Sequence, residues 1–310
     1  MKILVTGGTG LVGNGIKNAL KNTNHECIYL GSKDCDLISY TQTFELFSRE
    51  KPDCVIHLAA VVGGLFKNMN HKVDMFEKNL IINYNVIKSA HETGINKVVS
   101  CLSTCIFPDK TSYPINETML HDGPPHFSND AYAYAKRCLE IHCKTYREQY
   151  GRDYVCIIPT NIYGNFDNFN LENAHVLPAL IHKCYLAKKN KEKFIVKGTG
   201  KAMRQFIHSD DLGQLILWVV TDYSEKSNII LSVGEEHEIS IGHVAQLIAK
   251  EFEYEEMMEF DNLSADGQYK KTADNSKLMS YLPEYNFKSI QDGIKETVMW
   301  FIKNYDTCRK

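Results

Sequence analysis

The chain has 310 residues, of which 44% are hydrophobic and 24% are charged, and its formal net charge is -3. This length allows a sizeable core in one large or two interlocked domains, and the balance is that of an ordinary globular protein. The slight negative charge argues against a protein that binds nucleic acid or a membrane surface. The ten cysteines are too sparse for a disulfide scaffold, which favours a reducing, cytoplasmic setting. They include no Cys-x-x-Cys pair, which argues against a structural zinc site.

Apolar runs alternate with helix-forming segments over the first 160 residues or so. Strands are predicted at 2–6, 26–30, 54–57, 97–102 and 154–158, and helices at 11–20, 42–50, 74–92 and 131–150. This alternation predicts an α/β fold with a Rossmann-type, doubly wound parallel sheet.

After Gly164 the regular alternation of strands and helices ends. Helices are predicted at 176–188, 209–222, 240–252 and 288–304, and strands at 193–196 and 227–231. We expect a nucleotide-binding domain of residues 1–164 plus about 205–235, and a smaller, interlocked α+β substrate domain of residues 165–204 and 236–310.

A Gly-rich turn joins the first strand to the first helix. Its sequence is Gly7-Gly8-Thr9-Gly10-Leu11-Val12-Gly13. Gly7 permits the tight turn, Gly10 lets the backbone approach a pyrophosphate, and Gly13 allows close helix packing. The helix N-terminus adds free N–H groups and partial positive charge, so a dinucleotide is expected here.

The cofactor type is indicated by the residues that follow the second strand. An NAD site usually has an acid there, which binds the ribose 2′-hydroxyl, but this chain has Ser32 and Lys33. A hydroxyl and a cation suit a 2′-phosphate, so NADP(H) is favoured over NAD(H). The small residues Ala59 and Ala60, after the third strand, would let the backbone lie against the cofactor.

Tyr132 and Lys136 are four residues apart in an alanine-rich helix, so they share one face. An ammonium near a phenol favours the phenolate, and we therefore expect Lys136 to lower the pKa of Tyr132. Such a tyrosine can exchange a proton with a carbonyl or an alcohol near neutral pH. Ser103 lies at the carboxyl end of the fourth strand, where α/β sheets bind ligands.

Together, Ser103, Tyr132 and Lys136 resemble the extended short-chain dehydrogenase/reductase superfamily. The resemblance implies that the serine binds the reacting oxygen, the tyrosine exchanges the proton, and the lysine lowers the tyrosine pKa and holds the nicotinamide ribose. The resemblance narrows further to the 3,5-epimerase-4-reductases that act on GDP-4-keto-6-deoxy-D-mannose. The segments that carry this closer resemblance are 100–108, 159–161, 168–170 and 175–178. The similarity runs nearly the whole length of the chain.

This resemblance implies two reactions at one site. Cys105 as base and His175 as acid would epimerise the carbons C3 and C5 beside the 4-ketone, and which residue serves which carbon stays open. NADPH would then reduce the ketone, with Tyr132 supplying the proton, to give GDP-L-fucose. The resemblance also implies a homodimer, in which helices 74–92 and 131–150 form a four-helix bundle.

Further contacts follow from the resemblance. Arg204 matches a pyrophosphate-binding arginine, Lys183 lies where a basic residue often stands near the substrate phosphates, and Asp266 matches a loop acid near the sugar nucleotide. Lys197 stands where many relatives carry a tryptophan, which removes an aromatic contact with the nucleotide. The expected cofactor contacts also include Asp36, Leu37, Pro159, Asn161, Ile162 and His175.

Two alternatives stay open. Another sugar-nucleotide epimerase or dehydratase would share the fold, but dehydratases usually place a carboxylate where Thr104 and Cys105 stand. A nonenzymatic NADP(H)-sensing protein could also use this scaffold, although such proteins typically lose the Tyr/Lys pair. Loss of NADPH absorbance with the 4-keto-6-deoxy substrate would separate enzyme from sensor.

Overall fold

A parallel six-stranded sheet forms the centre of the molecule, in a computed structural model that describes residues 1–263 and 268–310. The strand order is β10-β5-β4-β3-β1-β2. These strands are β1 (Lys2–Thr6), β2 (Glu26–Leu30), β3 (Cys54–His57), β4 (Lys97–Cys101), β5 (Asp153–Pro159) and β10 (Ile229–Leu231). The order reverses between β1 and β3, and ligands bind at such a switch point, outside the carboxyl ends of the strands.

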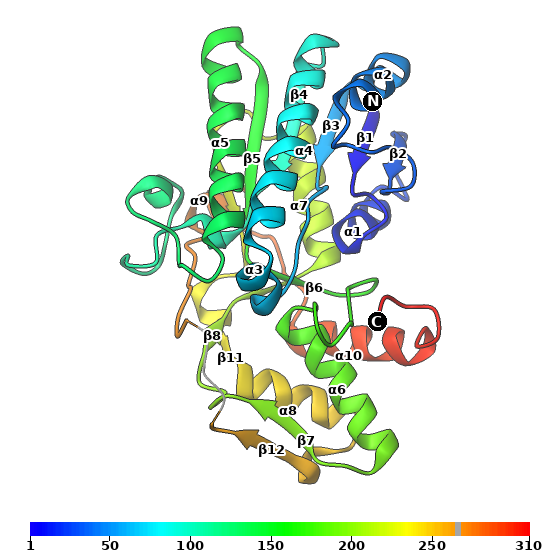
Figure 1. The fold of residues 1–310 in the computed structure, drawn as a ribbon, viewed down its shortest axis with the longest axis vertical. Coiled ribbons are helices and arrows are strands. Elements are labelled where there is room, and N and C mark those ends of the chain that lie inside the picture. Colours follow the sequence, from blue (N-terminus) through cyan, green and yellow to red (C-terminus); the bar gives the residue numbers. More distant parts are fainter. Residues whose placement is uncertain (264–267) are drawn as a thin grey trace.

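Helices cover both faces of this sheet (Figure 1). Alternate residues of one strand serve the two faces: Leu4 belongs to the core under α2 (Tyr40–Glu50), α4 (Lys72–Glu92) and α5 (Asp130–Tyr150). Its neighbours Ile3 and Val5 belong to the core under α1 (Leu11–Ala19) and α7 (Ser209–Thr221). The predicted doubly wound sheet is therefore confirmed.

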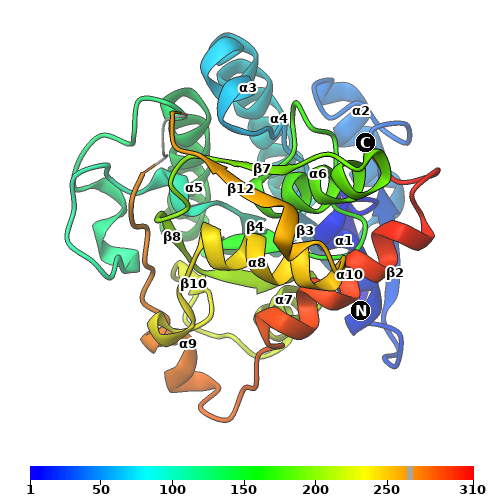
Figure 2. The same ribbon diagram turned by 90° about the horizontal axis from the view of Figure 1, so that it is seen from below.

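A second, smaller lobe lies beyond the carboxyl ends of the strands (Figures 1 and 2). Its core includes Phe169, Leu180 and Phe301. The lobe contains α6 (Val176–Asn190), α8 (Ile241–Glu251), α10 (Ile290–Lys303) and the parallel pair β7 (Phe194–Lys197) and β12 (Met258–Asp261).

The remaining elements are short. They are α3 (Leu65–Asn70), α9 (Ser276–Tyr281), the parallel pair β6 (Asn161–Tyr163) and β9 (Phe206–His208), the antiparallel pair β8 (Met203–Arg204) and β11 (Ile239–Ser240), and 3-10 turns at Thr104–Ile106, Glu117–His121, Glu235–His237 and Glu255–Met257. The α9 residue Leu278 packs against the core of the large sheet. None of the helices in the described ranges combines the length and the hydrophobicity needed to span a lipid bilayer.

Every strand and helix predicted from the sequence is present, with ends within two residues of the prediction. The strand predicted at 227–231 returns to the large sheet beside β5. The elements that the sequence did not reveal are α3, α9, β12 and the short strands that join the two lobes.

Candidate active site

A cavity of about 870 Å³ lies where the large sheet meets the smaller lobe. Its walls include the carboxyl ends of β1, β3, β4 and β5, the Gly-rich turn and the start of α6. The sites expected for a dinucleotide and for a reacting carbonyl therefore open into the same space.

The Gly-rich turn has the geometry that a phosphate requires. Gly7 has φ +69°, and a Cβ there would lie 2.8 Å from the nitrogen of Ala59, so only glycine fits. Gly10 is the N-cap of α1 and carries no side-chain cap, which leaves first-turn N–H groups for a ligand. Gly13 packs on Gly8, since its Cβ would approach the oxygen of Gly8 to 2.1 Å. The cavity is lined by Gly7, Thr9, Gly10, Leu11 and Val12, whereas Gly8 and Gly13 shape the turn from outside.

Most of the other residues expected to bind the cofactor also line the cavity: Ser32, Asp36, Leu37, Ala59, Ala60, Pro159, Asn161 and Ile162. Lys33 is exposed and is not among the lining residues. The cavity wall after β2 thus presents the Ser32 hydroxyl.

Tyr132 and Lys136 both line the cavity from α5. The Lys136 side chain is 2% exposed, and its Nζ donates a hydrogen bond of 2.8 Å to the carbonyl oxygen of Cys101. The same Nζ lies 5.8 Å from the centre of the Tyr132 ring. The helical spacing therefore brings the pair together as predicted, with the ammonium held at the end of β4.

The expected effect of Lys136 on the pKa of Tyr132 is wrong for this structure. Burial raises the pKa of Tyr132 well above its ordinary value, and the neighbouring thiols of Cys105 and Cys101 raise it further. Burial also lowers the pKa of Lys136. Desolvation is the largest influence on this pKa, so Tyr132 is a phenol at neutral pH and is prepared to give a proton.

Cys105 lies in the 3-10 turn after β4, and Ser103 directly precedes this turn. Ser103 lines the cavity, and its Oγ accepts a hydrogen bond of 3.4 Å from the Cys105 backbone N–H. Cys105 is buried and is not among the lining residues. Burial raises the pKa of the Cys105 thiol, while Lys271, Ser103 and Lys136 act in the opposite direction.

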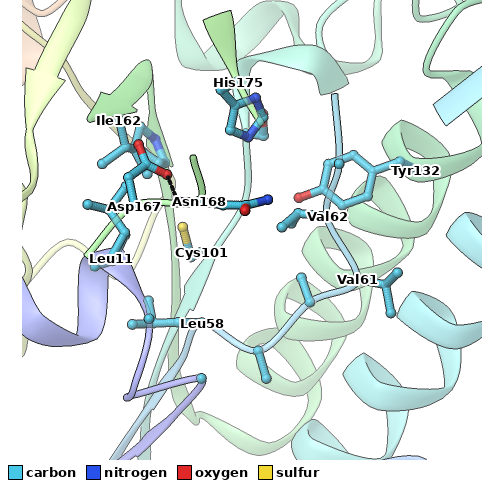
Figure 3. A pocket seen from close by; sticks show the side chains of 18 of the residues that line it. Leu11, Leu58, Val61, Val62, Cys101, Tyr132, Ile162, Asp167, Asn168 and His175 are labelled. Carbon is cyan, nitrogen blue, oxygen red and sulfur yellow. Dashed lines mark hydrogen bonds between the residues drawn. The ribbon is translucent and has the colours of Figure 1, made fainter. Parts of the chain in front are cut away.

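His175 is the N-cap of α6 and lines the cavity from the smaller lobe. Figure 3 shows its imidazole and the Tyr132 phenol directed toward the same region, with the amide of Asn168 between them. Although His175 is exposed to the cavity, desolvation by the surrounding protein lowers its pKa. The imidazole is therefore neutral at physiological pH.

Arg204 and Lys183, which were expected to bind the substrate, are not among the described residues that line the cavity. The Arg204 guanidinium donates hydrogen bonds to the carbonyl oxygens of Met203 and Gln268, at 2.6 and 2.7 Å. Lys183 is partly buried, and burial and the charge of Lys197 lower its pKa. Asp266 lies outside the described residues.

A buried hydrogen-bond chain, which the sequence did not reveal, connects the segment after β3 with α5. The Ala59 N–H donates to Thr6 Oγ1 at 3.3 Å, and Thr6 Oγ1 lies 2.8 Å from Nδ1 of His57. Nε2 of His57 lies 2.9 Å from Asn83 Oδ1, and Asn83 donates to the carbonyl oxygen of Ala135 at 3.4 Å. Burial lowers the pKa of His57 to about 3, so a neutral imidazole links β1, β3, α4 and α5.

Further lining residues were also missed, among them Asp167, Asn168 and Arg309. Arg309 reaches the cavity because its carbonyl oxygen accepts a 2.7 Å hydrogen bond from the Phe169 N–H. No local pattern predicts that residues 140 positions apart meet. The motif Asn168-Phe169-Asn170 identified this loop as part of the site but did not indicate that the loop contacts Arg309.

Within the described residues, one cluster has donor atoms spaced for a metal: His208, Asp210 and Glu296. Lys288 Nζ already lies 3.3 Å from Asp210 and 2.6 Å from Glu296. The two carboxylates are thus paired with an ammonium.

Comparisons with known proteins agree with one another. A profile of the NAD dependent epimerase/dehydratase family matches residues 3–234. GDP-L-fucose synthase from Dictyostelium discoideum is 53% identical over 99% of this chain and 97% of its own. The probable GDP-L-fucose synthase of Drosophila melanogaster is 49% identical, over 100% and 99%. The crystal structure of a GDP-L-fucose synthetase from Naegleria fowleri bound to NADP superposes with a TM-score of 0.95 and 47% identity, covering 100% of this chain and 95% of that one.

The chain belongs to the GDP-L-fucose synthase family. The family profile ends just after β10, so it spans the whole six-stranded sheet. The matched lengths of the individual GDP-L-fucose synthases also include the smaller lobe, which supplies His175, Asp167 and Arg309 to the cavity. The likeness to GDP-L-fucose synthases therefore extends to both walls of the candidate site.

Proposed function

We propose that this protein converts GDP-4-keto-6-deoxy-D-mannose to GDP-L-fucose by epimerisation at C3 and C5 followed by NADPH-dependent reduction of the 4-ketone. One observation carries the proposal: the Tyr132 phenol and the His175 imidazole face the same part of a cavity that the Gly-rich turn also lines (Figure 3). The names of the relatives support the same reaction.

Reduction of the ketone uses Tyr132, Lys136 and Ser103. NADPH, when bound, supplies the hydride. The raised pKa of Tyr132 keeps its proton in place until negative charge develops on the substrate oxygen, which then receives it. Lys136 is fixed on the Cys101 carbonyl beside the tyrosine, and the Ser103 hydroxyl faces the cavity to hold the reacting oxygen.

Epimerisation uses Cys105 and His175. The 4-ketone acidifies the hydrogens on C3 and C5, so one group must remove a proton and another must return one to the opposite face. We assign Cys105 as the base and His175 as the acid. Lys271, Lys136 and the Ser103 hydroxyl favour the thiolate against the effect of burial on the Cys105 pKa.

The binding roles follow the two lobes. We propose that residues 1–164 and 205–235 bind NADP(H) through the Gly-rich turn, with the Ser32 hydroxyl at the 2′-phosphate. Residues 165–204 and 236–310 would bind the sugar nucleotide, with Lys183, Arg204 and Asp266 near its phosphates and sugar. Lys33 would contribute long-range positive charge at the 2′-phosphate end.

We further propose a cytoplasmic homodimer. The outer faces of α4 and α5 carry exposed apolar side chains at helical spacing, among them Ile81, Tyr84, Tyr134 and Ile141. Tyr84 stacks on His142 at 5.5 Å, which joins the two outer faces into one surface. Two copies of this pair would bury the surface as a four-helix bundle. The ten free cysteines suit a reducing compartment.

The test is incubation with NADPH and GDP-4-keto-6-deoxy-D-mannose. We expect loss of NADPH absorbance and GDP-L-fucose as the product. Tyr132→Phe removes the proton donor and should reduce turnover by two to four orders of magnitude, while exchange of the C3 and C5 hydrogens with D2O continues. An unchanged NADPH signal with the parent protein would identify a sensor, and a product without inversion at C3 and C5 would identify a simple reductase.

A further inference from the structure

Asp167 is a buried acid in the cavity wall that the proposed chemistry does not use. Its side chain is 5% exposed. Oδ1 accepts a 2.7 Å hydrogen bond from the Asn168 backbone N–H, but Oδ2 has no hydrogen-bond partner among the described residues. A buried carboxyl oxygen without a partner is costly, so its position inside a ligand cavity points to a ligand.

The place of Asp167 in the cavity indicates which ligand group it meets. Figure 3 shows Asp167 on the same wall as Leu11 and Ile162. Leu11 is the first residue of α1, whose uncapped N-terminus is built for phosphate. Of the two acids among the described lining residues, Asp36 lies in the segment after β2, and its Oδ1 already accepts a hydrogen bond from the Ile38 N–H.

An ionised carboxylate on this wall would repel the phosphates of a dinucleotide. The groups that face Asp167 offer little compensation: Leu11 from α1 and Ile162 from β6 are uncharged, and His175 across the cavity is neutral. The hydrogen bond from the Asn168 N–H and the charge of Arg309 favour the ionised form, but burial outweighs both. A protonated carboxyl would instead offer an O–H donor to a phosphate oxygen, which is a strong type of hydrogen bond.

We propose that Asp167 binds NADP(H) as a neutral carboxylic acid, donating its proton to a pyrophosphate oxygen, so that cofactor binding takes up a proton. This inference rests on the proposed function only in taking NADP(H) as the ligand. Burial already raises the pKa of Asp167 to about 7 before any phosphate arrives, so little further change is needed.

The sign of the pH dependence follows from linkage. The phosphates would raise the pKa of Asp167 above its ligand-free value, so the protonated form is favoured in the complex. NADPH then binds most tightly below pH 7, and its Kd rises about tenfold per pH unit between pH 7 and the higher pKa of the complex. Asp167→Asn keeps the shape and a permanent N–H donor, and it should bind NADPH with little of this dependence.

The experiment is calorimetric titration of the full chain with NADPH at pH 7.5 in Hepes and in Tris, whose different ionisation heats report proton uptake. The parent protein should take up roughly three-quarters of a proton more than Asp167→Asn. The cofactor's own phosphates titrate alike in both proteins, so the difference isolates Asp167. Arg309→Gln should reduce the uptake, because Asp167 would already hold more of its proton before binding, whereas Lys310→Gln should leave it unchanged.

The outcomes separate the two proposals. Equal proton uptake by parent and variant would overturn the inference, as would tighter NADPH binding by Asp167→Asn at every pH from 6 to 8.5. If the variant does not fold, the parent alone decides, since its uptake must increase between pH 6.5 and 8. A parent protein that does not bind NADPH would overturn the proposed function itself.

Discussion

Desolvation sets the protonation states of the candidate catalytic residues. Burial raises the pKa values of Tyr132 and Cys105 and lowers that of His175, so all three groups are neutral at physiological pH. Neutral groups suit a reaction in which protons move in both directions, because the phenol gives a proton and the thiol must first lose one. Catalysis then depends on how readily each group changes state beside the substrate.

The thiol of Cys105 gives a prediction at this scale. Because burial raises the pKa of this thiol, only a small fraction is thiolate at pH 7, and this fraction grows about tenfold per pH unit up to the pKa. Exchange of the C3 and C5 hydrogens in D2O should therefore accelerate between pH 7 and 9. Mass spectrometry of the sugar nucleotide measures this exchange without the reductive step.

Cys105→Ser is the matched variant for this measurement. It should lose exchange by at least two orders of magnitude while NADPH binding is kept, since a hydroxyl is a far weaker acid than a thiol. Exchange at the parent rate in Cys105→Ser would falsify the assignment of the base.

Sequence spacing predicted some contacts of the site and could not predict others. Tyr132 and Lys136 lie on one helix, so a spacing of four residues was sufficient. The loop that carries Asp167 meets Arg309 through a backbone hydrogen bond from the Phe169 N–H to the Arg309 carbonyl oxygen, and burial of Asp167 is a property of the folded cavity. The sequence also could not predict in which direction the pKa of Tyr132 shifts, because desolvation depends on atoms from several elements.

At the level of elements, the longer helices and strands could be predicted from the sequence and the shortest ones could not. Long amphipathic helices such as α5 carry their own periodicity, and buried strands such as β1 are continuous apolar runs. The short strands β6 and β9 exist because Asn161–Tyr163 pair with Phe206–His208, and no local signal predicts that pairing. These short pairs join the lobes, so the geometry of the cavity was the least predictable part of the fold.

Close packing between helices gives a second prediction. A Cβ on Gly15 of α1 would lie 2.0 Å from the carbonyl oxygen of Ser209 at the start of α7, so both backbones would have to shift. Gly15→Ala should destabilise the protein by about 1–3 kcal/mol, measured by thermal unfolding.

Gly10→Ala is the control, because its Cβ would meet only the oxygen of Gly7, at 3.4 Å. It should keep the parent melting temperature but weaken NADPH binding, since the methyl group lies where the phosphates approach. The Gly-rich turn does not serve the cofactor if Gly10→Ala binds NADPH with the parent Kd.

Across the whole molecule, neither lobe completes the site alone. The lobe built on the large sheet supplies the Gly-rich turn, Ser103 and Tyr132, while the smaller lobe supplies His175 and Asp167. The segment after α10 returns to this boundary and places Arg309 in the cavity wall. A change in the relative position of the two lobes would separate the Tyr132 phenol from the His175 imidazole. The proposed reaction therefore depends on how the lobes pack together.

The proposed dimer is the prediction that belongs to the whole molecule. Tyr134, Cys138 and Ile141 follow one another at spacings of four and three residues on α5, and all three are exposed. Ile141→Glu would place a carboxylate in the apolar centre of a four-helix bundle, where burial of an unpaired charge is strongly unfavourable. Light scattering coupled to gel filtration should show the parent as a dimer and Ile141→Glu as a monomer with unchanged circular dichroism. Met299→Glu, on the exposed face of α10, should remain dimeric. A parent chain that is monomeric at micromolar concentration would contradict the dimer, and a Met299→Glu monomer would place the interface on α10.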